Sequence, residues 1–202
     1  MFISAIVLAA GESKRMGRTK QLLDVGGKPL LQHILDRIHQ TEVDEIILVL
    51  GHEAEQIQKT ISIFGAKVVL NPGYRQGMIT SIREGLQALD PRSEAFFIIL
   101  GDQPGIEPGV YSLLIREFRN RFPQKTIFLP AYKGKRGHPA LFSVKHRHEA
   151  SRIEGDQGFR EVLEMVPQEV FQVEIESESI VHDLDTPEQY QNYISKKPEE
   201  PP

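Results

Sequence analysis

Residues 3–20, "ISAIVLAAGESKRMGRTK", are the stretch that decides the fold. The apolar run that ends at Ala9 is rich in Ile, Val and Leu, which is typical of a buried strand. Ala10 and Gly11 then allow a ligand to approach the backbone closely. Four positive charges follow within seven residues: Lys14, Arg15, Arg18 and Lys20. We therefore expect a buried strand that leads into a loop for an anion.

This loop fits neither of the two best-known phosphate-loop patterns. A dinucleotide-binding turn needs G-x-G-x-x-G, and a P-loop needs four residues between its glycines, followed by Lys and then Ser or Thr. Five residues separate Gly11 from Gly17, and Arg, Thr and Lys follow. Backbone N–H groups together with Arg15 and Lys20 would suit a triphosphate. A solvated turn with surface cations fits equally well on charge alone.

Beyond this loop, apolar runs alternate with segments of helical periodicity. We expect strands at 45–51, 66–71, 95–102 and 126–132, and helices at 28–40, 53–65, 77–89 and 109–122. Phe64 and Met78 should face inward. Such alternation predicts an α/β fold: a single-domain, three-layer α/β/α Rossmann-like arrangement around a mostly parallel sheet.

The pattern becomes less regular after residue 132. We expect strands at 140–144 and 169–177, a helix at 159–166, and a final helix at 186–194. Thr186 would cap that last helix, with Pro187 at its first position. One domain should span 1–195, followed by a disordered tail at 196–202.

Composition excludes several classes of protein. The chain has 202 residues and no cysteine, which rules out disulfides, thiolate catalysis and cysteine-ligated metals. Net charge is −4, so the positive charge is local, which argues against nucleic-acid binding and for a small anionic ligand. No apolar run reaches the roughly 20 residues of a membrane span. The start of the chain lacks a basic signal-peptide region, and we expect a cytoplasmic protein.

Ligands of doubly wound sheets bind at the carboxyl ends of the strands. The loops expected there are polar and rich in glycine: 10–20, 70–78, 100–105 and 133–139. Asp102 directly follows the most apolar strand, so its carboxylate should point into the cleft as a ligand for Mg²⁺. Capping of the turn formed with Pro104 and Gly105 is the alternative role.

Other acidic and polar residues are less specific signals. Asp156 lies in a glycine-flanked turn, where it is either a second metal ligand or a helix cap. Asp183 and Asp185 receive no role. His138 follows the basic loop and is the histidine we expect to contact substrate. Ser81 lies inside a helix, which argues against a nucleophile, and direct transfer between two bound substrates needs none.

The first motif carries a family resemblance. "LAAGESKRMGRTKQLLDVGGKPLL", residues 8–31, resembles the signature of nucleotidyltransferases typified by the molybdenum cofactor enzymes and the sugar-1-phosphate nucleotidyltransferases. "NPGYRQGMITSIREGL", "LGDQPG", "RGHPALF", "EGDQGFREVL" and "HDLDTPEQY" are similar to the molybdenum cofactor cytidylyltransferase branch. The resemblance covers essentially residues 1–195.

This resemblance implies a set of site residues and a reaction. Nucleotide would be bound by Leu8, Ala9, Ala10, Gly11, Arg15, Lys20, Gly77 and Ser81. Arg15, Lys20 and Asp102 would form the catalytic set, with Mg²⁺ held by Asp102 and Asp156. Gln103, Arg136 and His138 would contact the acceptor. A phosphate oxygen of molybdopterin would attack the α-phosphorus of CTP, giving molybdopterin cytosine dinucleotide and pyrophosphate, for delivery to a receiving molybdoenzyme or its chaperone.

The choice of base and acceptor rests on fewer residues. The guanylyl branch resembles L-A-G-G, whereas Ala10 replaces the second small residue here and favours a pyrimidine. Met16 departs from the Phe often found in cytidylyltransferases. GTP or another nucleotide, a sugar-phosphate acceptor, and a non-catalytic carrier of molybdopterin or nucleotide are the alternatives. Two acidic candidates beside a phosphate loop favour the enzyme, because carboxylates help there only through a metal.

Overall fold

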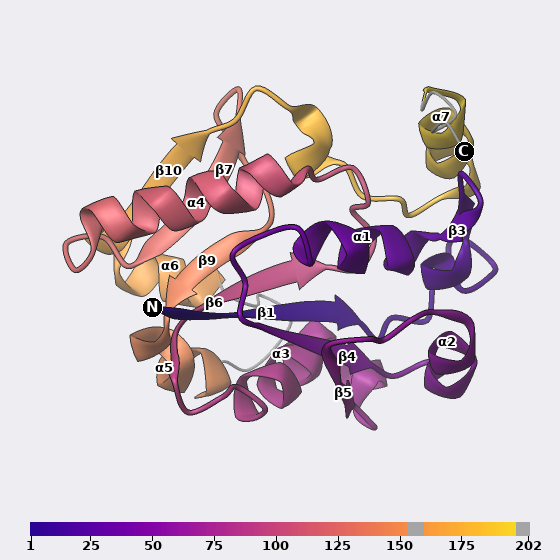
Figure 1. Cartoon of the computed structure of the whole chain (residues 1–202), viewed down its shortest axis with the longest axis horizontal. Coiled ribbons are helices and arrows are strands. Elements are labelled where there is room, and N and C mark those ends of the chain that lie inside the picture. The colour runs from indigo at the N-terminus through magenta and orange to yellow at the C-terminus, as the bar shows by residue number, and fades with distance from the viewer. Residues whose placement is uncertain (153–159, 197–202) are drawn as a thin grey trace.

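The computed structural model describes residues 1–152 and 160–196. Asp156, and the tail expected from residue 196 on, fall outside these ranges except for Lys196, which ends the last helix. Figure 1 shows a central sheet with helices against both of its faces. The expected three-layer α/β/α arrangement is therefore confirmed.

The central sheet has the order β10-β7-β9-β6-β1-β4-β5, with β8 paired to β7. Its strands are β1 (Phe2–Ala9), β4 (Glu45–Leu50), β5 (Ala66–Leu70), β6 (Ser93–Leu100), β7 (Ile127–Tyr132), β8 (Lys135–Arg136), β9 (Ala140–Ser143) and β10 (Val170–Glu174). β2 (Asp24–Val25) and β3 (Lys28–Pro29) form a separate antiparallel pair. The pairs β1–β4, β1–β6, β4–β5 and β7–β10 are parallel, as the alternating sequence predicts.

β8 and β9 are the exceptions: β8 pairs antiparallel with β7, and β9 runs antiparallel between β6 and β7. Only residues 133–139 connect β7 to β9. A parallel return needs a crossover of a dozen or more residues, so this short connection forces the chain to turn back on itself. Because β9 is antiparallel to both β6 and β7, β7 runs parallel to β6. The basic loop of residues 133–139, which follows β7, therefore lies at the same end of the sheet as the carboxyl ends of β1 and β6.

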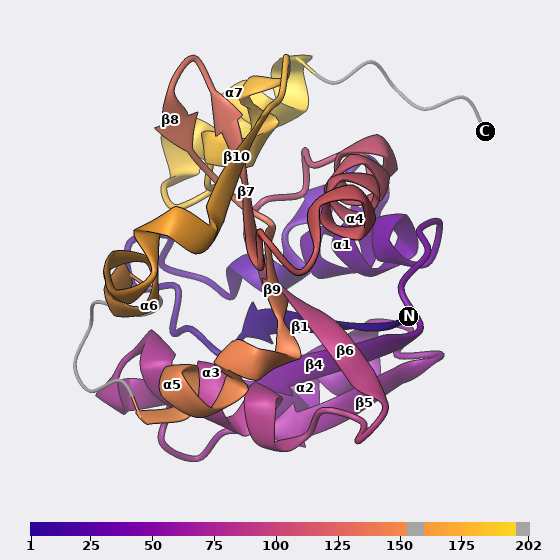
Figure 2. The same cartoon turned by 90° about the vertical axis from the view of Figure 1, so that its left-hand side faces the viewer.

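Helices cover the two faces of the sheet unequally. α1 (Leu30–Ile38) and α4 (Pro108–Arg121) lie on one face, and α3 (Met78–Gln87), α5 (Arg147–Arg152) and α6 (Arg160–Met165) on the other (Figure 2). Alternate residues of β1 enter two separate apolar clusters: Val7 packs on the α1 side and Ile6 on the α3 side. Every helix in the described ranges is too short or too polar to cross a membrane.

Two side chains expected in the core are exposed. Phe64 is 86% exposed, because α2 (Ala54–Thr60) ends before it and Ile61 is already extended. Met78 is 51% exposed as the first residue of α3, and Ile79 takes the buried position. For Phe64 the helical period was extended past the end of the helix, whereas Met78 lies on the exposed side of the first turn of α3. Thr186 does cap α7 (Pro187–Lys196), since its hydroxyl accepts from the Gln189 N–H at 3.3 Å.

Candidate active site

The carboxyl ends of β1 and β6 come unusually close together. The Gly101 N–H donates to the Leu8 carbonyl at 2.9 Å. A Cβ at position 101 would lie 2.7 Å from that oxygen, so only glycine allows this approach. The loop after β1 and Asp102 after β6 therefore face the same small volume.

The loop after β1 folds back onto its own strand. Ser13 adopts a positive φ of 53°, and its hydroxyl accepts from the Lys20 N–H at 3.1 Å. Buried Gln21 donates to the Ala9 carbonyl at 3.1 Å, and Met16 is only 5% exposed. These contacts anchor the loop and direct the Lys20 side chain over the sheet edge.

Lys20, Arg15, Asp102 and Asp185 form a chain of ion pairs. The Lys20 Nζ lies 2.5 Å from Asp102 Oδ2 and 2.8 Å from Asp185 Oδ1. Arg15 Nη2 lies 2.5 Å from Asp185 Oδ2. The Lys20 side chain is 14% exposed, whereas that of Lys14 is 79% exposed. The sequence prediction gave Asp185 no role, because it lies 165 positions from Lys20 and no local pattern marks it.

The pKa shifts in this cluster follow from burial and charge. Burial acts to lower the pKa of Lys20, but Asp102 and Asp185 outweigh it and the pKa is raised. For Asp185, burial acts upward, but Lys20 and Arg15 hold its pKa below the usual value. Burial raises the pKa of Asp102 by more than Lys20 lowers it. Asp102 is thus the carboxylate that a further cation would stabilise most.

A metal ion fits this carboxylate. Asp102 Oδ1 is buried and has no hydrogen-bond partner. Among residues 1–152 and 160–196, no group of three or more His, Asp or Glu side chains is arranged to hold a metal. Asp102 and the nearby Asp185 nevertheless offer the one or two carboxylates with which Mg²⁺ is usually bound beside phosphates. Asp156 lies outside the described residues.

The loop after β5 is held by Asn71, which the sequence analysis did not single out. Its side-chain N–H group donates to Thr80 Oγ1 at 2.8 Å and to Ser81 Oγ at 2.9 Å. Its Oδ1 accepts from the Gly73 N–H at 2.8 Å. Ser81 is thereby buried and engaged inside the protein. Gly77, the N-cap residue before α3, has a φ of 105°, which favours glycine.

The loops after β1, β4 and β5 pack tightly against one another. A Cβ at Gly51 would lie 2.7 Å from Tyr74 Cβ and 2.9 Å from Ala10 Cβ. The His52 N–H donates to the Ala10 carbonyl at 3.1 Å. Ala10 is only 5% exposed. Its methyl group therefore packs against Gly51. Any effect of Ala10 on a bound ligand is transmitted by the residues that it contacts.

Gln103 and His138 lie near Asp102, on the side of β6. Gln103 Nε2 donates to Asp183 Oδ1 at 2.6 Å. Burial lowers the pKa of His138, although the Ile98 carbonyl, Asp183 and Asp102 act in the opposite direction.

Arg136 is not brought into this group. With the Gln172 amide oxygen facing it, the Arg136 guanidinium donates to that oxygen at 3.0 and 3.1 Å. Gln172 lies on β10, so the exposed Arg136 side chain is held at the edge of the sheet.

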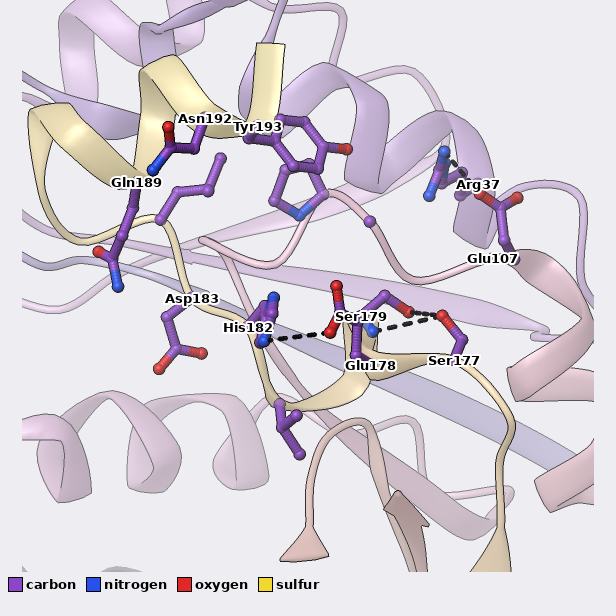
Figure 3. A pocket seen from close by; sticks show the side chains of 14 residues that line it. Arg37, Glu107, Ser177, Glu178, Ser179, His182, Asp183, Gln189, Asn192 and Tyr193 are labelled. Atoms are coloured by element: carbon purple, nitrogen blue, oxygen red, sulfur yellow. Dashed lines mark hydrogen bonds and ion pairs between the residues drawn. The ribbon is translucent and has the colours of Figure 1, made fainter. Parts of the chain in front are cut away.

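A separate cavity of about 580 Å³ lies on the other side of the segment that carries Asp183. Its walls come from α7, residues 177–184 and the loop before α4, and Figure 3 shows their side chains. The ion pair between Arg37 and Glu107, at 2.9 Å, borders one end. Lys20 and Asp102 are not among its lining residues.

The sequence of the chain is similar to a family of nucleotide-using transferases. Residues 5–172 match the family described as the MobA-like NTP transferase domain. Molybdenum cofactor cytidylyltransferase of Escherichia coli is 29% identical over 191 residues, covering 93% of each chain. Nicotine blue oxidoreductase of Paenarthrobacter nicotinovorans is also 29% identical, over 93% of this chain and 94% of that one. Overall identity therefore does not select a substrate.

Solved structures show the same fold over nearly the whole chain. Rv0371c of Mycobacterium tuberculosis has a TM-score of 0.84 at 29% identity, covering 97% of this chain and 99% of that one. Its complex with manganese has a TM-score of 0.79 at 26% identity, over 98% and 100% of the two chains. A Methanothermobacter nucleotidyl transferase, 21% identical, has a TM-score of 0.80 over 96% of each chain. A homologue thus binds a divalent metal.

Proposed function

The chain belongs to the MobA-like NTP transferase family, and we propose that it transfers CMP from CTP to the phosphate of molybdopterin. Nucleotidyl transfer is the activity of the family, and the chain is a transferase enzyme. The choice of CTP and molybdopterin is our proposal. The observation that carries it is the Lys20–Asp102–Asp185 cluster, in a chain that aligns over its length with a cytidylyltransferase.

Lys20 and Arg15 would bind the phosphates of the nucleotide. Both cations already pair with carboxylate oxygens, at 2.5 to 2.8 Å. A triphosphate would compete with Asp185 for the same two cations. Backbone groups of the loop, from Leu8 and Ala9 to Ala10 and Gly11, would line the approach to it.

Asp102 would hold Mg²⁺ through its unpartnered oxygen, with Asp185 or Asp156 as a second ligand. When bound, Mg²⁺ neutralises charge on the triphosphate and on the leaving pyrophosphate. The manganese complex of a homologue supports the use of a divalent ion. An oxygen of the acceptor phosphate then forms a bond to the α-phosphorus as the bond to pyrophosphate breaks.

No protein nucleophile is required for this reaction. Alignment of the two bound substrates and neutralisation of their charge accelerate the transfer. Gly77 and Ser81 would support the nucleotide, Ser81 through the network of Asn71. Gln103 and His138 would contact the acceptor, with Arg136 at the edge. We further propose that the enzyme acts in the cytoplasm and delivers its product to a molybdoenzyme or its chaperone.

Release of pyrophosphate tests this function. Wild-type protein is mixed with molybdopterin, Mg²⁺ and CTP, GTP, UTP or ATP in turn. We expect release with CTP above all other nucleotides. Preference for GTP would identify the reaction as guanylyl transfer. If a sugar phosphate in place of molybdopterin gives the only turnover, the acceptor is a sugar phosphate. Binding of nucleotide without any pyrophosphate release contradicts the enzyme and supports a carrier.

A pair of variants identifies the second metal ligand. Asp185→Asn and Asp156→Asn are compared by titrating Mg²⁺ against the rate. The variant that lacks the ligand should need at least about ten-fold more Mg²⁺, since lost ligands and their supports cost about 10- to 100-fold in metal affinity. The other variant is the control for this comparison.

A further inference from the structure

The two edges of the central sheet differ in the side chains that lie against them. β10 forms one edge and β5 the other (Figure 2). On β10, the Arg121 guanidinium lies 3.9 Å from the centre of the Phe171 ring, and Arg136 binds the Gln172 amide. Charged side chains at an edge strand discourage pairing with other chains. β10 is therefore protected in the usual way.

The single charge of β5 is held away from its edge. Lys67 Nζ donates to the Ala88 carbonyl, at the end of α3, at 2.6 Å. The rest of the strand is apolar, and Leu70 is 58% exposed. Phe64, two residues before the strand, is 86% exposed. An apolar edge strand that is not covered is a template for another strand.

The backbone of β5 directs hydrogen-bonding groups outward. The Asn71 N–H donates to the Leu50 carbonyl at 2.8 Å, so residue 71 faces β4. Backbone groups face alternate sides along a strand, which directs those of Val68 and Leu70 away from β4. Across residues 1–152 and 160–196, β4 is the one strand that pairs with β5. A strand from another chain would satisfy these outward groups.

An antiparallel copy of β5 matches this edge. Val68 is the middle residue of the strand, so a two-fold axis beside it aligns all five residues. Ala66 then lies opposite the partner subunit's Leu70, a small side chain against a large one. Lys67 lies opposite the partner subunit's Val69, so the two lysines do not face each other directly.

Phe64 would extend this contact. In an antiparallel pair, the start of one strand lies beside the end of the other. The exposed Phe64 ring therefore comes next to the partner subunit's Leu70, which is the most exposed apolar residue of the strand. Two such contacts form, one at each end of the paired strands.

Symmetry favours a second β5 over β10 as the partner of this edge. Pairing of β5 with β10 of another copy leaves one free edge of each kind, so further copies could add without limit. Pairing of β5 with β5 is the same contact seen from both sides, and it closes after two copies.

We propose that the chain forms a two-fold dimer in which β5 pairs antiparallel with β5 of a second copy, so that one sheet runs through both. The partner is a second copy of this chain, and the surface consists of β5 and Phe64. This inference goes beyond the proposed function and does not depend on it. The loop of residues 71–77, which follows β5 directly, lies next to this surface.

Sedimentation of the purified full chain over a range of concentrations tests the dimer. We expect a species with the mass of two 22.9 kDa chains. Leu70→Lys places a charge on the outer edge and should weaken the dimer by about ten-fold or more. Met165→Lys is the matched control, since Met165 is 63% exposed on α6, and this variant should dimerise like wild type.

Cross-linking tests the register, because the chain has no cysteine of its own. Directly opposed residues of this kind lie about 5.5 Å apart between Cα atoms, within reach of a disulfide. Val68→Cys should therefore form a disulfide-linked dimer on mild oxidation. Leu70→Cys is the control, because the two copies of residue 70 lie about 13 Å apart, four residues along the strand. It should stay unlinked.

Three outcomes overturn the inference. One is wild-type protein that stays monomeric at every concentration. Another is a dimer that Leu70→Lys leaves as tight as Met165→Lys does, since the contact then lies elsewhere. The third is cross-linking of Leu70→Cys as fast as that of Val68→Cys, which rejects the register. If Val68→Cys does not fold, Leu70→Lys still decides. None of these measurements involves a nucleotide, so the proposed function stands or falls separately.

Discussion

The two halves of the site differ in how their polar groups are satisfied. In the half that we propose binds the nucleotide (residues 10–19, 51–53 and 71–77, called the nucleotide half), Asn71 donates to Thr80 and Ser81 and accepts from Gly73. In the half that we propose binds the acceptor (residues 101–106 and 133–139, called the acceptor half), Asp102, Gln103 and His138 each carry a buried atom without a partner. The polar groups of the first half are therefore satisfied within the chain, whereas those of the second half leave three atoms for a further partner.

The largest effect is expected at the boundary of the two halves. Asp102→Asn keeps the shape of the side chain and an oxygen for Lys20, but it removes the charge that a metal needs. We expect turnover to fall by about 10²- to 10³-fold, the cost of losing one electrostatic group in an active site, with an unchanged melting temperature. Initial rates of pyrophosphate release with Mg²⁺ measure this effect.

The control for that variant is Asp90→Asn. Asp90 is paired with Arg92 at 2.8 Å in the turn before β6, and its loss should leave the rate within about two-fold. Near-normal Mg²⁺-dependent turnover of Asp102→Asn would remove Asp102 from the reaction and place the boundary elsewhere.

Overpacking should damage the nucleotide half next most. Gly51→Ala places a methyl group 2.7 Å from Tyr74 Cβ and 2.9 Å from Ala10 Cβ. We expect a loss of about 1–3 kcal/mol in the free energy of unfolding, as for other overpacked sites, together with weaker CTP binding. Gly109→Ala is the control, since no atom lies within 4 Å of its added Cβ. Equal stability of the two variants would contradict tight packing of these loops.

The next prediction compares the halves directly. Asn71→Ala leaves Ser81 and the Gly73 N–H without a partner, which should cost about 1–3 kcal/mol of stability. Gln103→Met removes the unpartnered Oε1 and one hydrogen bond, that of Nε2 to Asp183, whereas Asn71→Ala removes three, so Gln103→Met should cost less. Urea unfolding of both variants measures the difference. A larger loss for Gln103→Met would reverse the comparison.

The smallest effect is expected for Ala10→Gly. A methyl group that touches the substrate is worth roughly 10-fold or more in selectivity. Ala10 is 5% exposed and faces Gly51, so we expect a change in the CTP-to-GTP ratio of kcat/KM below about 10-fold. A 100-fold change would mean direct contact with the base. No change would remove Ala10 as a selectivity element.

Most of the fold was predictable because each strand and helix has its own local pattern. β1, β4, β5, β6 and β7 lie where apolar runs predict them. Errors arose at the ends of helices: the helical period was extended past α2 at Phe64, and in the first turn of α3 the buried position is Ile79 and not Met78. The direction of β9 follows from the length of the preceding connection, which apolar patterning alone does not reveal.

The site was less predictable, because its contacts join distant segments. Asp102 could be found from its place at the end of an apolar strand. Asp185 and Asn71 could not, since the importance of each depends on neighbours that only the folded chain brings together. Arg136 stood in a basic loop like a ligand residue, but pairing of β8 with β7 turns it toward Gln172.

The ion pair between Lys20 and Asp185 has a consequence for how the protein is made. During synthesis the loop of residues 10–20 leaves the ribosome early, and the carboxylate of Asp185 follows 165 residues after Lys20. A nascent chain that stops before residue 185 already has Lys20 and its partner Asp102, but it lacks the carboxylate that pairs with Arg15 and forms the second ion pair of Lys20. The C-terminal segment therefore completes an ion-pair cluster that begins near the opposite end of the chain.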